Sequence, residues 1–199
     1  SCWDLRLRRC GPGTWAWGTA PTITMIYRWL IFFSLLTASL MPALAGEISG
    51  RVMLSDSRDP GVRNRRDYSG VVISLKALAG APAALPEVKK AVILQKNKMF
   101  SPHMLAIPVG STVDFPNADP IFHNAFSSYN GQIFDVGLYP PGTTRSVRFA
   151  REGVVRVFCN IHSSMSAMIV VLGTPYYATT RKDGSFSITD VPPGDYAMT

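Results

Sequence analysis

Short apolar segments separated by glycine- and proline-containing turns fill the chain after residue 46. The predicted strands cover 47–54, 71–78, 88–95, 104–107, 112–115, 144–149, 153–158 and 167–172. Turn sequences such as Pro60-Gly61 and Asp183-Gly184 lie between them, and helical periodicity is almost absent apart from a weak tendency over 85–90. This pattern predicts an all-β fold built as a sandwich of antiparallel sheets.

The first 45 residues differ from the rest. Residues 1–24 hold three of the four tryptophans and two of the three cysteines, and we interpret them as translated sequence upstream of a true start at Met25. Residues 25–45 resemble a signal peptide, with basic Arg28, an apolar stretch and a small-x-small cleavage site at 43–45. A membrane anchor is the alternative, but the apolar stretch is short for a bilayer. We expect a periplasmic or secreted protein without a membrane segment after cleavage.

The charge of the remaining chain is modest. Excluding residues 1–45 leaves 16 basic and 12 acidic residues, a net charge of about +4. The basic residues are scattered, with only Arg63, Arg65 and Arg66 close together, so no stripe or patch points to nucleic acid. The last residues, 191–199, end within a predicted strand, and we expect the sequence to be a fragment.

One cysteine remains after residue 45. Cys159 opens a Cys-x2-His-x2-Met motif with His162 and Met165, directly after an apolar strand, and His123 lies 36 residues upstream. A lone thiol in an oxidising compartment is a liability unless it is buried or bound to a metal. Two imidazoles, one soft thiolate and a weak axial thioether are the ligands of a blue-copper electron-transfer site.

Other assignments of these residues are open. Cys159 alone could be a small buried apolar residue, which is a common fate of a free cysteine. Met168 competes with Met165 for the axial position, although it lies in an apolar strand where core packing suits it better. His103 begins a strand, and we interpret it as a surface histidine.

Little in the sequence indicates catalysis. Asp119 and Asp135 have no carboxylate partner at a useful spacing, and we interpret both as turn residues. Nucleophile-elbow, phosphate-loop and CxxC motifs are absent, and three histidines are too few for a multicopper oxidase. We therefore expect a protein that is not an enzyme.

The segment 97–117 resembles the middle of a cupredoxin, with its aromatic-x-Pro, apolar strand, glycine turn and following strand that ends in Asn117. The resemblance extends over 88–172 and is nearest to amicyanin-like and plastocyanin-like proteins, including those labelled methylamine-utilisation proteins. It implies a Greek-key β-sandwich in which Asn124 ties the two ligand loops together. It also implies one type 1 copper ion with the ligands His123, Cys159, His162 and Met165.

The flanks carry a weaker resemblance. Residues 46–80 and 173–199 are similar to the opening and closing parts of a carboxypeptidase-regulatory-like β-sandwich, which would be truncated here. The cupredoxin domain would then be inserted into that sandwich, or joined to it, after a linker around 80–86. Alternatively, both flanks are extra strands of one enlarged sandwich.

We interpret the chain as an exported type 1 copper protein that carries single electrons between redox partners. His162 would be the electron port, and a cytochrome or dehydrogenase would dock weakly near it on Pro120, Ile161 and Met165. The alternative is a copper-binding module for storage, delivery or sensing without electron transfer. A sandwich without metal would leave the Cys/His/Met spacing to chance.

Overall fold

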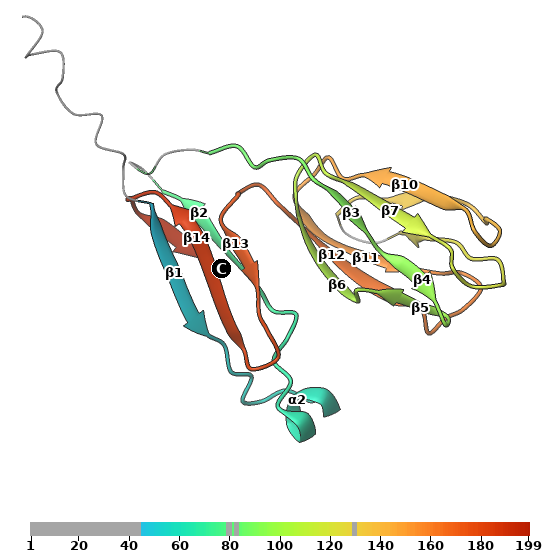
Figure 1. The fold of residues 1–199 in the computed structure, drawn as a ribbon, viewed down its shortest axis with the longest axis horizontal. Helices are drawn as coiled ribbons and strands as arrows, with labels where there is room; N and C mark the ends of the chain where they lie inside the picture. The colour runs from blue at the N-terminus through green and yellow to red at the C-terminus, as the bar shows by residue number, and fades with distance from the viewer. Residues whose placement is uncertain (1–44, 79–80, 82–83, 129–130) are drawn as a thin grey trace, which may run out of the picture. The chain divides into compact units, whose positions relative to one another are not determined.

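The computed structural model describes residues 45–78, 81, 84–128 and 131–199 (Figure 1). The predicted upstream sequence (1–24) and all but the last residue of the predicted signal peptide (25–45) lie outside the described residues. Within the described part, none of the helices is long and apolar enough to cross a membrane.

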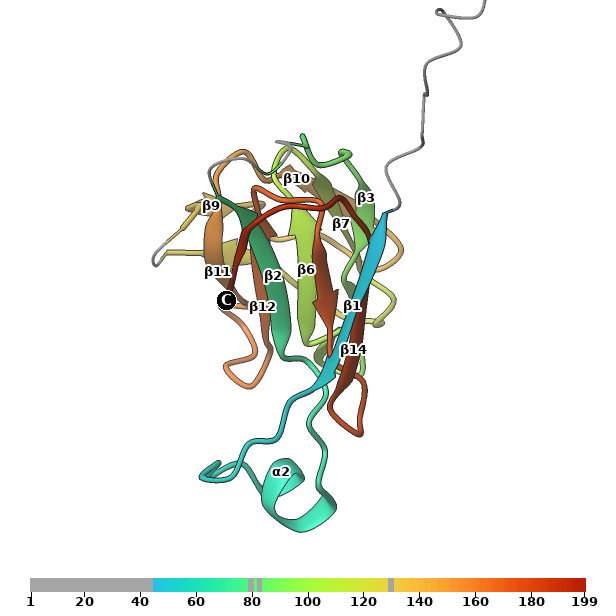
Figure 2. The ribbon, with the colours of Figure 1, turned by 90° about the vertical axis from the view of Figure 1, so that its left-hand side faces the viewer.

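The larger sheet has five strands in the order β6-β12-β11-β8-β9. Its strands are β6 (Met104–Pro108), β8 (Phe126–Ser127), β9 (Phe134–Asp135), β11 (Gly153–Phe158) and β12 (Ser166–Leu172). Figure 2 shows β11, β12 and β6 in this order across the view. Every second residue of β12 is buried, as expected for a strand with one face on a core.

The opposing sheet has three strands in the order β10-β7-β3. These are β3 (Lys90–Val92), β7 (Thr112–Pro116) and β10 (Thr144–Arg148). A two-stranded hairpin of β4 (Leu94–Lys96) and β5 (Met99–Ser101) follows β3. The predicted strand over 88–95 is thus two strands, because Ile93 turns fully into the core between them and donates its N–H to Asp114.

Side chains from both sheets form one hydrophobic core. Phe115 and Val113 come from β7, while Val155 and Ile169 are paired across β11 and β12, and all four are fully buried. Further members are Ile93, Phe100, Ile107, Ala125, Tyr139, Phe149, Val157, Cys159, Met165, Ala167 and Val171. The core therefore includes two of the predicted copper ligands.

The chain crosses between the sheets at the turn from β6 to β7. Gly110 has a φ of +88° there and donates its N–H to Phe149 in the same core, a conformation that disfavours any residue with a Cβ. Crossings of this kind place β6 parallel to β12 and β3 parallel to β7. The prediction of antiparallel sheets is wrong for these two pairs and holds for the other paired strands, and the all-β cupredoxin-like sandwich is confirmed.

The flanking segments form their own sheets. β1 (Gly46–Arg51) pairs with β14 (Ser185–Val191), and β2 (Val72–Ala77) pairs with both β13 (Tyr177–Thr179) and β15 (Tyr196–Met198). These strands share a second buried cluster, which comprises Ile73, Leu75, Tyr176, Phe186, Ile188 and Val191. The assignment of the flanks to a regulatory-like sandwich, and the domain boundaries drawn from it, stay predictions.

One short helix was not expected. The Pro60-Gly61 pair, predicted as a turn, begins α2 (Pro60–Arg65). Proline suits the first helical turn because it has no N–H to satisfy, and the side chain of Asp59 accepts a hydrogen bond from Val62 at 3.2 Å. The weak helical tendency over 85–90 gives no helix, since β3 begins at Lys90.

Ile169→Ala should lower the free energy of unfolding by about 2–5 kcal/mol, because it leaves a cavity between the sheets. Val154→Ala is the matched control, since Val154 lies in the neighbouring strand and is 48% exposed. That change should cost less than about 1 kcal/mol, the span of strand propensities. Chemical denaturation followed by circular dichroism gives both values, and equal losses would contradict the placement of Ile169.

Candidate metal centre

The loop between β11 and β12 carries three of the predicted ligands. Cys159 directly follows the last residue of β11, and its side chain is buried. The loop folds back on itself: Met165 donates its N–H to the carbonyl of His162 at 2.9 Å, and Cys159 donates its N–H to the carbonyl of Met165 at 3.3 Å. These bonds fix the loop backbone around the thiol.

The fourth predicted ligand, His123, comes from the loop between β7 and β8. A two-residue backbone bridge with Tyr139 holds it, with N–H to carbonyl distances of 3.2 and 2.9 Å. The ring of His123 is fully buried, whereas that of His162 is partly exposed. The two rings lie edge to face, with centroids 4.9 Å apart.

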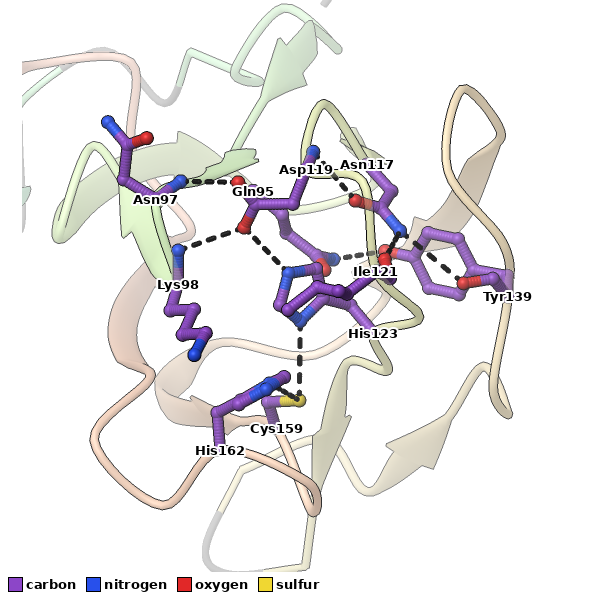
Figure 3. A network of polar contacts seen from close by, with 10 residues as sticks. All are labelled: Gln95, Asn97, Lys98, Asn117, Asp119, Ile121, His123, Tyr139, Cys159 and His162. Carbon is purple, nitrogen blue, oxygen red and sulfur yellow. Dashed lines mark hydrogen bonds and ion pairs between the residues drawn. The ribbon is translucent and has the colours of Figure 1, made fainter.

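Three donor atoms converge where the loops meet. Cys159 Sγ lies 3.9 Å from Nδ1 of His123 and 3.9 Å from Nδ1 of His162 (Figure 3). All three lie within 4.8 Å of one another. A first-row metal bonds to thiolate and imidazole at about 2.0–2.3 Å, as zinc does, so one ion can reach all three donors. The residues present therefore fit a single copper ion.

The two candidate axial methionines differ in position. Met165 is fully buried in the same cluster as Cys159, while Met168 is partly exposed within β12, opposite Arg156 of β11. The backbone N–H of Met168 also donates a hydrogen bond to the carbonyl of His103 at 2.8 Å. The position of Met165 in the thiol loop favours it as the axial ligand, which stays a prediction.

Asn124 connects the two ligand loops. Its side-chain carbonyl accepts the N–H of Asn160 at 3.1 Å, and its amide donates to Asp135 at 2.7 Å. Asn124 is fully buried, whereas Asp135 and Asn160 are exposed, so both bonds are part-buried. Asp135, interpreted from the sequence as a turn residue, also accepts the N–H of Gly137 at 2.8 Å. Asp135 therefore stabilises the turn and also binds the side chain of Asn124.

The sequence interpretation missed the role of Asp119. This carboxylate is 7% exposed and lies 2.8 Å from Nε2 of His123. It also accepts the backbone N–H groups of Asn97 at 2.6 Å and Lys98 at 2.8 Å. The sequence could have suggested this contact, because Asp119 lies four residues before His123, a predicted metal ligand. Asp119 does also occupy a turn, since its own N–H binds the side chain of Asn117 at 3.0 Å.

Electrostatics keep these groups in the forms that a metal needs. Burial opposes ionisation of Asp119, but the amides of Lys98 and Asn97 and the ring of His123 hold its pKa below the usual value. Desolvation, followed by repulsion from His123 and Lys98, lowers the pKa of His162. A lowered pKa favours the neutral imidazole, which is the form that binds metal.

Other residues singled out in the sequence differ in their exposure. His103 is exposed and its ring Nδ1–H donates to the carbonyl of Ser166 at 2.8 Å, as suits a surface histidine. Pro120 and Ile161 are exposed, as a docking surface requires, but the buried Met165 cannot contribute to one. Phe122, which precedes His123 in the chain, is 54% exposed.

A polar pair lies beside His123. The buried amide of Gln95 donates to the hydroxyl of Tyr139 (Figure 3). That hydroxyl in turn donates to the carbonyl of Phe115 at 2.9 Å. Burial raises the pKa of Tyr139 far above its ordinary value, so the phenol stays protonated. The pair thus holds Tyr139, whose backbone carries His123, without adding a charge to the site.

No protein-family profile and no curated relative matches the chain. Among solved structures, a purple cupredoxin from Nitrosopumilus maritimus is 29% identical and is matched over 41% of this chain and 99% of its own, with a TM-score of 0.37. A Cu-containing nitrite reductase from Thermus scotoductus SA-01 is 26% identical over 50% of this chain and 26% of its own, with a TM-score of 0.40. A Cu(I) amicyanin variant is 19% identical over 50% of this chain and 92% of its own, with a TM-score of 0.39.

Fold and donor set together define the class. Residues 90–172 form a two-sheet β-sandwich around one core, and two of its loops bring two imidazoles and a thiolate within reach of one ion. Those donors, with a thioether on the thiolate loop, are the ligand pattern of type 1 copper. This part of the chain is a cupredoxin-like β-sandwich whose donors fit a single copper ion.

Met165→Leu should keep the copper and raise its reduction potential, because the thioether donates electron density that favours Cu(II). A tenfold shift in preference towards Cu(I) corresponds to about 59 mV. Met168→Leu is the matched control: it roughly conserves volume, should cost less than about 1.5 kcal/mol of stability and should leave the potential unchanged. Voltammetry of both variants measures this, and a shift confined to Met168→Leu would make Met168 the axial ligand.

Proposed function

We propose that this chain is an exported type 1 copper protein that carries single electrons between redox partners. The observation that carries the proposal is the convergence of the donor atoms of Cys159, His123 and His162 within 4.8 Å of one another. The donors come from loops whose backbones are hydrogen-bonded on both sides of the site. When bound, copper supplies the one-electron couple.

A rigid donor set suits electron transfer. The thiol and one imidazole are buried in the core of a sandwich, where side chains are close-packed and move little. Ligands that keep their places in both oxidation states require little reorganisation when an electron arrives or leaves. A copper store or delivery module would instead benefit from ligands that open to release the ion, and the bonds that close the loop between Cys159 and Met165 oppose opening.

The partly exposed His162 is the proposed electron port. Its neighbour Ile161 is 47% exposed, and Phe122, next to the other histidine ligand, is 54% exposed. A small apolar surface of this kind suits the brief encounters of redox proteins, whose interfaces are at the low end of the size range. We propose a cytochrome or a dehydrogenase as the partner and expect no catalytic turnover of the chain's own.

Cys159→Ser should abolish the intense visible thiolate-to-copper charge-transfer band of the copper-loaded protein. A serine alkoxide is a hard donor and far more basic than a thiolate, so the soft ligand that gives the band is lost. Absorption spectra of both proteins after addition of copper(II) test this. A band that persists in the variant would remove Cys159 from the site.

Ile161→Glu should slow electron exchange between the Cu(I) and Cu(II) forms by about tenfold or more, within the one to three decades that mutants of one interface span. The charge would oppose apolar contact beside His162 while leaving the ligands in place. Val154→Glu is the control, because Val154 is equally exposed (48%) but lies five strand residues, roughly 16 Å, from Cys159.

Line broadening in NMR spectra of mixed oxidation states measures the exchange rate. Unchanged exchange in Ile161→Glu, or equal slowing in both variants, would contradict this docking surface. Stable copper binding with no exchange in the wild-type protein would favour the storage or delivery function instead.

A further inference from the structure

Asp119 has an unusual set of partners for a buried carboxylate. Its two oxygens face three N–H groups: those of Asn97, Lys98 and the ring of His123. An ionised carboxylate only accepts hydrogen bonds, so the ring nitrogen facing it, Nε2, must carry the imidazole proton. In the neutral imidazole the other ring nitrogen, Nδ1, is then unprotonated, and it lies 3.9 Å from Cys159 Sγ.

The two backbone donors come from the turn of the β4–β5 hairpin. Asn97 and Lys98 both have a φ of 55°, in the left-handed region typical of two-residue hairpin turns. Their consecutive N–H groups point at the same carboxylate, as Figure 3 shows. The hairpin therefore binds both carboxylate oxygens of Asp119, independently of the contact between Asp119 and the imidazole.

A purely structural role would be complete with the turn alone. Asp119 already caps the hairpin through its oxygens and receives support at its own N–H from Asn117. The third donor, the buried ring of His123, adds nothing to the hairpin. It does set the direction in which His123 presents its free nitrogen, and that direction is towards the thiol and His162.

We propose that Asp119 is the positioning residue of the copper centre: anchored by the β4–β5 turn, it fixes the tautomer and orientation of His123 and lowers the reduction potential of the copper. The proposal rests on the proposed copper function. A carboxylate behind an imidazole makes the ligand more basic and adds negative charge near the ion. Both effects stabilise Cu(II) more than Cu(I), because the ion of higher charge gains more.

The first test needs neither copper nor a variant. In the metal-free wild-type protein at mildly alkaline pH, nitrogen NMR of His123 should show a protonated Nε2 and an unprotonated Nδ1. Free imidazole side chains exchange between the two tautomers, so a single form reports the carboxylate contact. A proton on Nδ1, or an averaged pair, would overturn the proposal whatever the fate of the copper function.

The second test is Asp119→Asn. The amide removes the charge and offers one acceptor oxygen to three donors, so His123 should lose its fixed tautomer. Removal of such a partner typically weakens metal binding by about 10–100-fold, and the loss should be larger for Cu(II). Each tenfold difference between the two oxidation states raises the potential by about 59 mV.

Asp114→Asn is the matched control. Asp114 is also partly buried and carries the same charge, but its side-chain partners are Ser146 at 2.6 Å and Lys90 at 3.0 Å, neither of which is a candidate ligand. The copper reduction potential and the His123 tautomer of the Asp114→Asn variant should match those of the wild-type protein. If Asp119→Asn loses stability but keeps the wild-type potential and tautomer, Asp119 only supports the fold and the proposal is wrong.

The outcomes distinguish a failure of the Asp119 proposal from a failure of the proposed copper function. A protein that binds copper with the expected band but exchanges no electrons would contradict electron transfer and leave the tautomer and potential results intact. A protein that fails to bind copper would remove the copper function, while the metal-free tautomer would still decide whether Asp119 positions His123.

Discussion

The site depends on the contact between two loops that are 36 residues apart in the chain. The thiolate loop closes on itself through the hydrogen bonds of Met165, and the side chain of Asn124 joins it to the loop of His123. Loop closure over this distance costs conformational entropy. The close-packed sandwich offsets that cost, because each loop continues directly into strands whose inner faces form one core.

Buried polar groups impose the second constraint. A carboxylate as buried as Asp119 is unfavourable unless it is fully hydrogen-bonded, and here two turn amides and an imidazole satisfy it. The same bonds organise the surroundings of the thiol. The β4–β5 turn and the ring of His123 are therefore linked through one side chain.

Much of the fold could be predicted from alternation and turns. The strands near 112–115, 153–158 and 167–172 lie within one residue of their expected bounds, because each has one face on the core. The short strands β5, β8 and β9 were missed, because two or three residues are too few to show the alternation of apolar and polar side chains that marks a strand. The parallel pairing of β6 with β12 was missed as well, because pairing depends on where the chain crosses between sheets, which local pattern does not encode.

The sequence by itself determined the predicted donor set: one thiol, two imidazoles and a thioether, with three of them in a single short loop after a strand. The identity of these donor groups and their spacing along the chain are properties of the sequence itself. Only the tertiary structure decided that Asp119 reaches His123, that Met165 is buried and that His162 is partly exposed. Burial and ring orientation follow from packing between segments distant in the chain, so no local pattern contains them.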